Sequence, residues 1–124
     1  MLDALVATRV TNPVFIGGDI HSYWATDLKA EFANPLSPTV ATEFVGTSIT
    51  SDPPPRELIL EVIPENPHVR YFESRYRGYV AVDLTRDRME TRFQVISDRR
   101  DPNAVVSTLQ RFVVESGRPG AISA

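Results

Sequence analysis

The sequence contains no cysteine among its 124 residues, so disulfide bonds and thiolate metal sites are excluded. Long hydrophobic runs are also missing, and no run approaches the roughly 20 apolar residues that a membrane-spanning helix needs. The first residues, 1–6, lack the basic region of a secretory signal peptide. We therefore expect no membrane span, and any export signal is expected outside this sequence.

Lysine is almost absent, because Lys29 is the only lysine beside twelve arginines. The formal net charge is -3 and no cluster of Lys and Arg occurs, so the sequence does not indicate a nucleic-acid partner. The preference for arginine suits carboxylate or phosphate partners, and it is also what a genome rich in G and C produces. The second explanation is the simpler one.

Most of the chain has the two-residue periodicity of β-strands, within a length that fits one domain or a piece of a larger one. Strands are expected at 14–16, 22–32, 41–50, 69–73, 78–84, 89–96 and 105–115, with residues 116–120 closing the last one. The pair at 78–84 and 89–96 flanks a short polar turn and predicts a hairpin whose sheet is packed on one face. The run at 14–16 is apolar throughout, which predicts a central strand covered on both faces.

Two segments have helical periodicity. Residues 2–9 predict a helix of barely two turns. Asp52, followed by three prolines, predicts the start of a second helix of about three turns that Pro64 and Pro67 end, with Asp52 able to cap it. The apolar stripe of this helix consists of Leu58, Ile59, Val62 and Ile63. The sequence thus predicts a β-rich α/β protein with one mid-chain helix.

Two polar side chains follow the apolar run at 14–16. Gly17 and Gly18 lead into Asp19 and His21, which alternation along a strand would place on the same side. A carboxylate and an imidazole at a strand end suit a hard-metal site or an acid–base pair, and the glycines let the backbone approach a ligand closely. The alternative is that Asp19 satisfies its own loop and that His21 is a structural histidine.

One aspartate and one histidine do not complete a metal site, because zinc takes about four ligands and calcium six or more. Asp27 and Glu31 are expected to be solvated charges on a strand face, and His68 a satisfied loop histidine. Either the chain is not an enzyme, or further ligands lie on sequence outside it.

A group of hydroxyl side chains follows the strand at 41–50. It consists of Thr47, Ser48, Thr50 and Ser51. These side chains could line a phosphate pocket, or they could satisfy the backbone of their own loop, which is the favoured interpretation. The sequence contains no Gly-x-Ser-x-Gly elbow and no Walker loop.

Four sequence blocks, in this order, resemble the carboxy-terminal part of the PhoD-like alkaline phosphatases, which are binuclear metallophosphoesterases. The blocks are Gly-Gly-Asp-Ile-His-Ser-Tyr-Trp at 17–24, Glu-Phe-Val-Gly-Thr-Ser-Ile at 43–49, Asn-Pro-His-Val-Arg-Tyr-Phe at 66–72 and Arg-Gly-Tyr at 77–79. The resemblance covers nearly the whole chain, and four ordered blocks are far more specific than any one of them.

The resemblance implies a four-layered α/β/β/α sandwich of two mixed sheets flanked by helices, of which residues 1–124 would be a single domain or a fragment. It implies hydrolysis of phosphate monoesters and diesters with two metal ions, iron and calcium in the best-understood branch. Manganese or zinc would also suit carboxylate and imidazole ligands. By resemblance, Asp19 is a metal ligand, and His21 is either a metal ligand or a catalytic residue that contacts the phosphate.

The remaining ligands of that family lie in amino-terminal blocks that do not occur here. The resemblance therefore implies that the chain alone is inactive and needs the missing amino-terminal half of the fold. A half-sandwich would expose a sheet edge and an apolar face, so pairing with that half or self-association is expected. Family members are often exported. The rival hypothesis is a non-catalytic, β-rich interaction or structural module.

Overall fold

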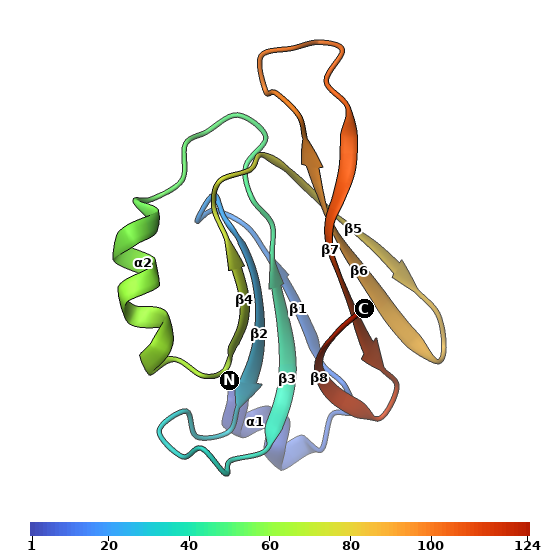
Figure 1. The fold of residues 1–124 in the computed structure, drawn as a ribbon. Coiled ribbons are helices and arrows are strands. Elements are labelled where there is room, and N and C mark those ends of the chain that lie inside the picture. The colour runs from blue at the N-terminus through green and yellow to red at the C-terminus, as the bar shows by residue number, and fades with distance from the viewer.

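Two four-stranded β-sheets face each other in the computed structural model, which describes all of residues 1–124 (Figure 1). The first sheet consists, in spatial order, of β1 (Val14–Gly17), β3 (Thr39–Val45), β2 (Tyr23–Lys29) and β4 (Val69–Glu73). The second consists of β5 (Gly78–Leu84), β6 (Arg88–Ile96), β7 (Val106–Glu115) and β8 (Arg118–Ser123). The first sheet is mixed, because β1 runs parallel to β3, whereas every other pair is antiparallel.

Two short helices lie outside the sheets. α1 (Leu2–Thr8) precedes β1, and α2 (Arg56–Val62) continues into the single 3-10 turn η1 (Ile63–Glu65). Figure 1 shows α2 beside β4, on the side of the first sheet that faces away from the second sheet. Neither helix has the length and apolar character of a membrane span. The predicted β-rich α/β class, mixed sheet, mid-chain helix and β5–β6 hairpin are confirmed.

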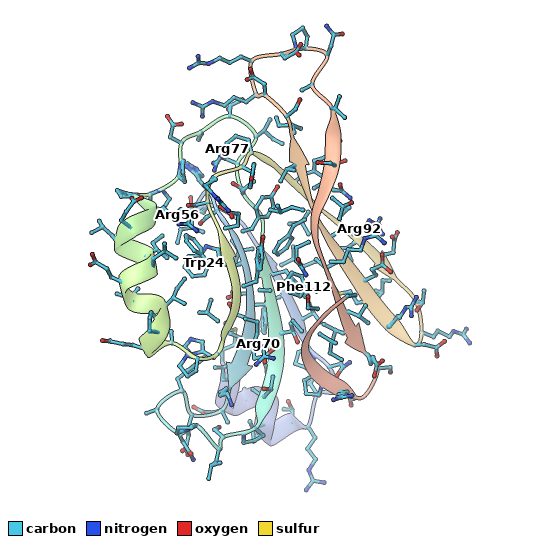
Figure 2. All side chains as sticks on the ribbon, in the orientation of Figure 1. Trp24, Arg56, Arg70, Arg77, Arg92 and Phe112 are labelled. Carbon is cyan, nitrogen blue, oxygen red and sulfur yellow. The ribbon has the colours of Figure 1, made fainter.

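The core lies between the two sheets and is largely aromatic. Tyr23 and Phe44 project into it from the first sheet, and Phe93 and Phe112 from the second. The Phe93 ring stacks on Tyr23 with 4.8 Å between ring centroids and lies 5.4 Å from the Phe112 ring. Figure 2 labels Phe112 between the two sheets. Every second residue of β6 from Met89 is buried, so the prediction of a sheet packed on one face is confirmed.

Polar contacts also join the sheets, and one of them corrects an expectation. Asp27 was expected to be a solvated charge, but only 14% of its side chain is exposed. Its Oδ1 accepts a hydrogen bond from the Ala121 backbone N–H at 3.0 Å, and its Oδ2 lies 3.6 Å from Arg70 Nε. Asp27 therefore holds β8 against β2, because a carboxylate next to a sheet edge can satisfy an unpaired backbone N–H.

β1 is an edge strand, and the prediction of a central strand covered on both faces is wrong. It pairs only with β3, and 61% of the Ile16 side chain is exposed. An apolar run predicts that both faces will be covered, but it does not say that the covering partner lies within the same chain.

The second helix also differs from its prediction. α2 begins after Pro55, without a side-chain cap, and has two α-helical turns, to which η1 adds a third turn in 3-10 geometry. The Asp52 carboxylate does not cap it, because it pairs with Arg99 at 2.7 Å. None of the α2 residues is buried. The helix therefore contributes little to the core of this chain.

One strand was not predicted at all. β7 confirms the strand expected at 105–115. The segment at 116–120, expected to close that strand, contains the start of β8. Gly117, with φ 76°, makes the tight turn between the two strands. Pro119 is tolerated because β8 lies at the edge of its sheet, where a missing N–H costs no ladder bond.

Candidate functional site

The loop that follows β1 carries both predicted site residues. β1 ends at Gly17, so strand alternation does not extend to Asp19 and His21. Both residues have left-handed backbone conformations, with φ of 75° and 57° respectively. Such conformations are uncommon outside glycine, cost about 1–3 kcal/mol each, and concentrate at functional sites. The sequence located the loop correctly, but the geometry expected for it was wrong.

Asp19 is exposed. Its carboxylate accepts no hydrogen bond and forms no ion pair within the chain, so it does not satisfy its own loop. The local turn is closed by backbone atoms instead, because the Ile20 N–H donates to the Gly18 carbonyl at 3.0 Å. The Asp19 carboxylate is thus available to a ligand or to another polypeptide.

His21 is half-buried, and its imidazole makes a specific contact. Its Nδ1 lies 2.9 Å from the backbone carbonyl oxygen of Asp52. The His21 carbonyl accepts hydrogen bonds from the Thr47 hydroxyl at 2.9 Å and from Arg77 Nη1 at 3.0 Å. Both the ring and the backbone of His21 are therefore fixed by residues that lie far away in the sequence.

Arg77 is the centre of this arrangement. Its side chain is buried, and Figure 2 shows it between the ends of the strands. Besides the His21 carbonyl, Nη1 contacts the Ser48 hydroxyl at 2.7 Å and the Ser51 carbonyl at 2.8 Å, while Nη2 donates to the Ser74 carbonyl. One guanidinium thus ties together three segments of the chain, at 21, 48–51 and 74, around the loop of His21.

The charges near Arg77 are partly compensated. Burial lowers the pKa of Arg77, and the neighbouring Arg99 lowers it further, yet an arginine stays protonated under all ordinary conditions. A hydrogen bond from Arg99 holds the pKa of Asp52 below its usual range. A polar cleft of about 300 Å³ opens beside these residues. Arg75 also lines this cleft and is paired with Glu73, so the cleft carries little net charge.

The hydroxyl side chains after β3 serve the backbone. The Thr47 hydroxyl contacts the carbonyls of His21 and Tyr76, and the Ser48 hydroxyl donates to the Ser51 carbonyl at 2.6 Å. The expectation that this loop satisfies its own backbone is confirmed for Ser48, whereas Thr47 satisfies backbone carbonyls of two other segments.

The residues of this chain do not make a complete metal centre. No group of three or more His, Cys, Asp or Glu side chains is placed to hold an ion. His68 lies apart and packs edge-on against Phe32, with 4.6 Å between ring centroids, as expected for a loop histidine. Asp19 and His21 could contribute two ligands, but no metal-dependent step follows from this chain alone.

Sequence reasoning missed the residues that support His21. Arg77, Asp52 and Arg99 reach the site from three separate segments, and periodicity does not distinguish a buried arginine from an exposed one. The available signal was the Arg-Gly-Tyr block at 77–79, which belonged to the resemblance without having a role assigned to it.

The fold and the site define a class: an α/β protein of two facing sheets, with a polar loop that offers two candidate metal ligands. The chain belongs to the PhoD-like phosphatase family, whose model matches residues 1–93. The family resemblance of the four sequence blocks is thereby confirmed.

Two known proteins show how much of the family the chain represents. It is 32% identical over 123 residues to alkaline phosphatase D of Bacillus subtilis (strain 168), covering 97% of this chain and 21% of that protein. It matches a solved structure of PhoD with a TM-score of 0.87 and 31% identity, covering 99% of this chain and 24% of the other. The chain thus spans between a fifth and a quarter of the length of these relatives.

Proposed function

We propose that the chain forms one wall of the active site of a PhoD-like phosphatase that hydrolyses phosphate monoesters and diesters. In this proposal it is the carboxy-terminal part of a four-layered sandwich, and it is inactive alone. The observation that supports this most strongly is the match of almost the whole chain to a small share of alkaline phosphatase D.

Asp19 is proposed as a metal ligand and His21 as a ligand or catalytic residue. The exposed Asp19 carboxylate and the left-handed backbone at both positions support these roles. Iron and calcium are proposed as the metals, with manganese or zinc also compatible with these ligand types. The remaining ligands have to come from polypeptide outside this chain, because no third candidate lies with these two.

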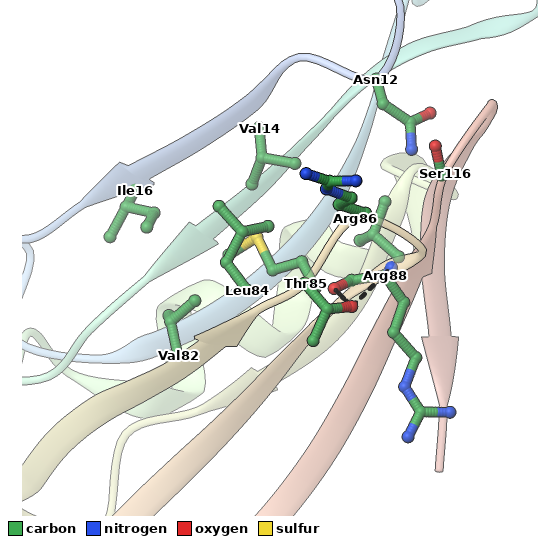
Figure 3. A pocket seen from close by; sticks show the side chains of 11 residues that line it. Asn12, Val14, Ile16, Val82, Leu84, Thr85, Arg86, Arg88 and Ser116 are labelled. Carbon is green, nitrogen blue, oxygen red and sulfur yellow. Dashed lines mark hydrogen bonds between the residues drawn. The ribbon is translucent and has the colours of Figure 1, made fainter.

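The proposed partner surface is an apolar groove between β1 and β5, both of which are sheet edges. The groove has a volume of about 350 Å³, and Figure 3 shows Val14 and Ile16 on one side of it and Val82 and Leu84 on the other. Edge strands offer unpaired backbone groups to another strand. We propose that the remainder of the phosphatase fold covers this groove, and that self-association of the chain is the competing outcome.

Reconstitution tests the function. The chain is mixed or co-expressed with a polypeptide that carries the remainder of alkaline phosphatase D from Bacillus subtilis, outside the 21% that this chain matches. Calcium and iron are added, then manganese and zinc in turn, and a chromogenic phosphate monoester and diester are the substrates. We expect no turnover from the chain alone and turnover from the mixture. Asp19→Asn and His21→Gln should abolish turnover, whereas the matched variants Asp3→Asn and His68→Gln should retain it.

The same assay distinguishes the phosphatase proposal from the rival hypothesis of a non-catalytic interaction module. The absence of a third candidate ligand favours a non-catalytic interaction module. If the two polypeptides form a stable complex that turns over neither substrate under any metal, the interaction module is the better description. Turnover by the chain alone, abolished by Asp19→Asn, would contradict the proposal that outside polypeptide completes the site.

A further inference from the structure

The hydrogen bond of the His21 ring determines where the ring carries its proton. Nδ1 lies 2.9 Å from the Asp52 carbonyl oxygen, which has no proton to donate. Nδ1 must therefore be the protonated nitrogen of this contact. In the neutral imidazole, Nε2 is then left without a proton and keeps a free electron pair. Nε2 makes no hydrogen bond within the chain.

Arg77 holds the two sides of this contact with one nitrogen atom. Nη1 donates to the carbonyl of His21 at 3.0 Å and to the carbonyl of Ser51, the residue before Asp52, at 2.8 Å. The two backbone segments that carry the imidazole and its acceptor carbonyl are therefore joined by a buried side chain. Arg99 adds a second anchor, because it pairs with the Asp52 carboxylate at 2.7 Å.

We propose that Arg77 is a positioning residue that holds His21 as the Nδ1–H tautomer, so that His21 acts through an unprotonated Nε2. The functional meaning of this inference rests on the proposed phosphatase site, whereas the tautomer itself does not. An unprotonated Nε2 donates an electron pair to a cation or accepts a proton. In the neutral ring it does not donate a hydrogen bond to a phosphate oxygen, so of the two roles left open for His21 the neutral Nδ1–H tautomer selects the metal ligand.

The tautomer can be read directly by NMR on the 124-residue chain labelled with 15N. Long-range proton–nitrogen spectra at a pH where both imidazoles are neutral separate protonated from unprotonated ring nitrogens. The chain has only two histidines, so a His68→Gln variant assigns the His21 signals. We expect a protonated Nδ1 and an unprotonated Nε2 in His21. A protonated Nε2 in the unmodified chain would overturn the inference, whether or not any phosphatase activity is found.

Variants then test the role of Arg77. Arg77→Lys keeps the charge but loses the planar guanidinium, whose second nitrogen, Nη2, donates to the Ser74 carbonyl and so fixes where Nη1 lies between the two carbonyls. We expect its His21 nitrogen signals to move toward each other as the two tautomers mix. Arg92→Gln is the matched control, since Arg92 pairs with Asp83 and Glu90 on β5 and β6, and it should leave these signals unchanged.

Arg99→Gln removes the ion pair with Asp52 and leaves the buried Arg77 side chain in place. It serves as the test if Arg77→Lys does not fold. It should also shift the His21 signals toward each other, by less than Arg77→Lys does. If either folded variant lowers the melting temperature but leaves a pure Nδ1–H tautomer, the altered residue is merely structural and the positioning role is overturned for it. An inactive reconstituted complex with the expected tautomer would count against the proposed function and not against this inference.

Discussion

Gly78, the first residue of β5, occupies a place where no side chain fits. A Cβ atom there would overlap the Gln94 carbonyl oxygen and lie 2.5 Å from the Tyr23 hydroxyl, which itself donates to that carbonyl. We expect Gly78→Ala to lower the free energy of unfolding by more than about 2 kcal/mol, because backbone atoms of β6 would have to move. Urea denaturation measures this change.

Gly18 provides the matched control, since a Cβ atom built there meets nothing within 4 Å. Gly18→Ala should change the free energy of unfolding by no more than about 0.5 kcal/mol. Equal effects of the two substitutions would contradict the steric explanation.

Glu73 makes stability depend on acid pH. Its buried carboxylate accepts hydrogen bonds from the backbone N–H groups of Ser74 and Arg75, each at 2.9 Å, and pairs with the Arg75 guanidinium. The hydrogen bond from Arg75 is the largest cause that lowers the pKa of Glu73. A lowered folded-state pKa stabilises the fold above the unfolded-state value near 4.3, and this stabilisation is lost as the pH falls through the folded-state pKa.

We therefore expect Glu73→Gln to destabilise the chain at pH 7 and to have a progressively smaller effect below pH of about 4. Urea denaturation of both forms at several pH values measures the difference. Glu31→Gln, at an exposed position, should give a difference that stays near zero throughout. A constant effect of Glu73→Gln from pH 7 down to pH 3 would show that its charge is not involved.

At the scale of the elements, β6 contains one residue that contradicts its apolar face. Thr91 is fully buried between Met89 and Phe93, and its hydroxyl has no hydrogen-bond partner. A buried hydroxyl without a partner keeps its desolvation cost. Thr91→Val should therefore raise the free energy of unfolding by about 1 kcal/mol.

Thr108 on β7 is the control for this substitution. It is exposed, and its hydroxyl exchanges hydrogen bonds with the Gln94 amide. Thr108→Val should not stabilise the chain. If Thr91→Val instead destabilises it, the Thr91 hydroxyl has a partner, such as an internal water molecule.

The elements also show where local patterns succeed. β6 alternates buried residues with partly buried or exposed ones over its whole length, so its period alone predicts both the strand and its inner face. The sequence of β8 does not predict a strand in this way, because Arg118-Pro119-Gly120 has the composition of a turn. It becomes a strand through its pairing with β7 and through the hydrogen bonds of Gly120 to Thr42 and of Ala121 to Asp27.

At the scale of the whole molecule, the two sheets leave an uncovered apolar groove between their edges. β1 and β5 are both sheet edges, and the apolar groove between them is lined by exposed side chains such as Leu84, which is 76% exposed. Exposed apolar patches of this kind promote association. We expect the isolated chain to self-associate as its concentration rises, and light scattering measures its mass.

Leu84→Lys should reduce this association, because a charge in the groove opposes its burial against another chain. Leu36→Lys is the control, since Leu36 is 92% exposed but does not line the groove. A monomer at every concentration, or an equal effect of both substitutions, would exclude the groove as the site of association. The same Leu84→Lys variant should also bind the complementary polypeptide less tightly in the reconstitution.

The sequence by itself determined the family, most of the strands and the loop of Asp19 and His21, because ordered motifs and two-residue alternation are local properties of a chain. Only the tertiary structure decided that β1 is an edge strand, that the His21 ring lies against the Asp52 carbonyl, and that Arg77 joins the two segments that carry them. The reason is physical: Arg77 contacts His21 across 56 positions of sequence. A hydrogen bond between such distant residues depends on how the sheets pack, which no local periodicity records.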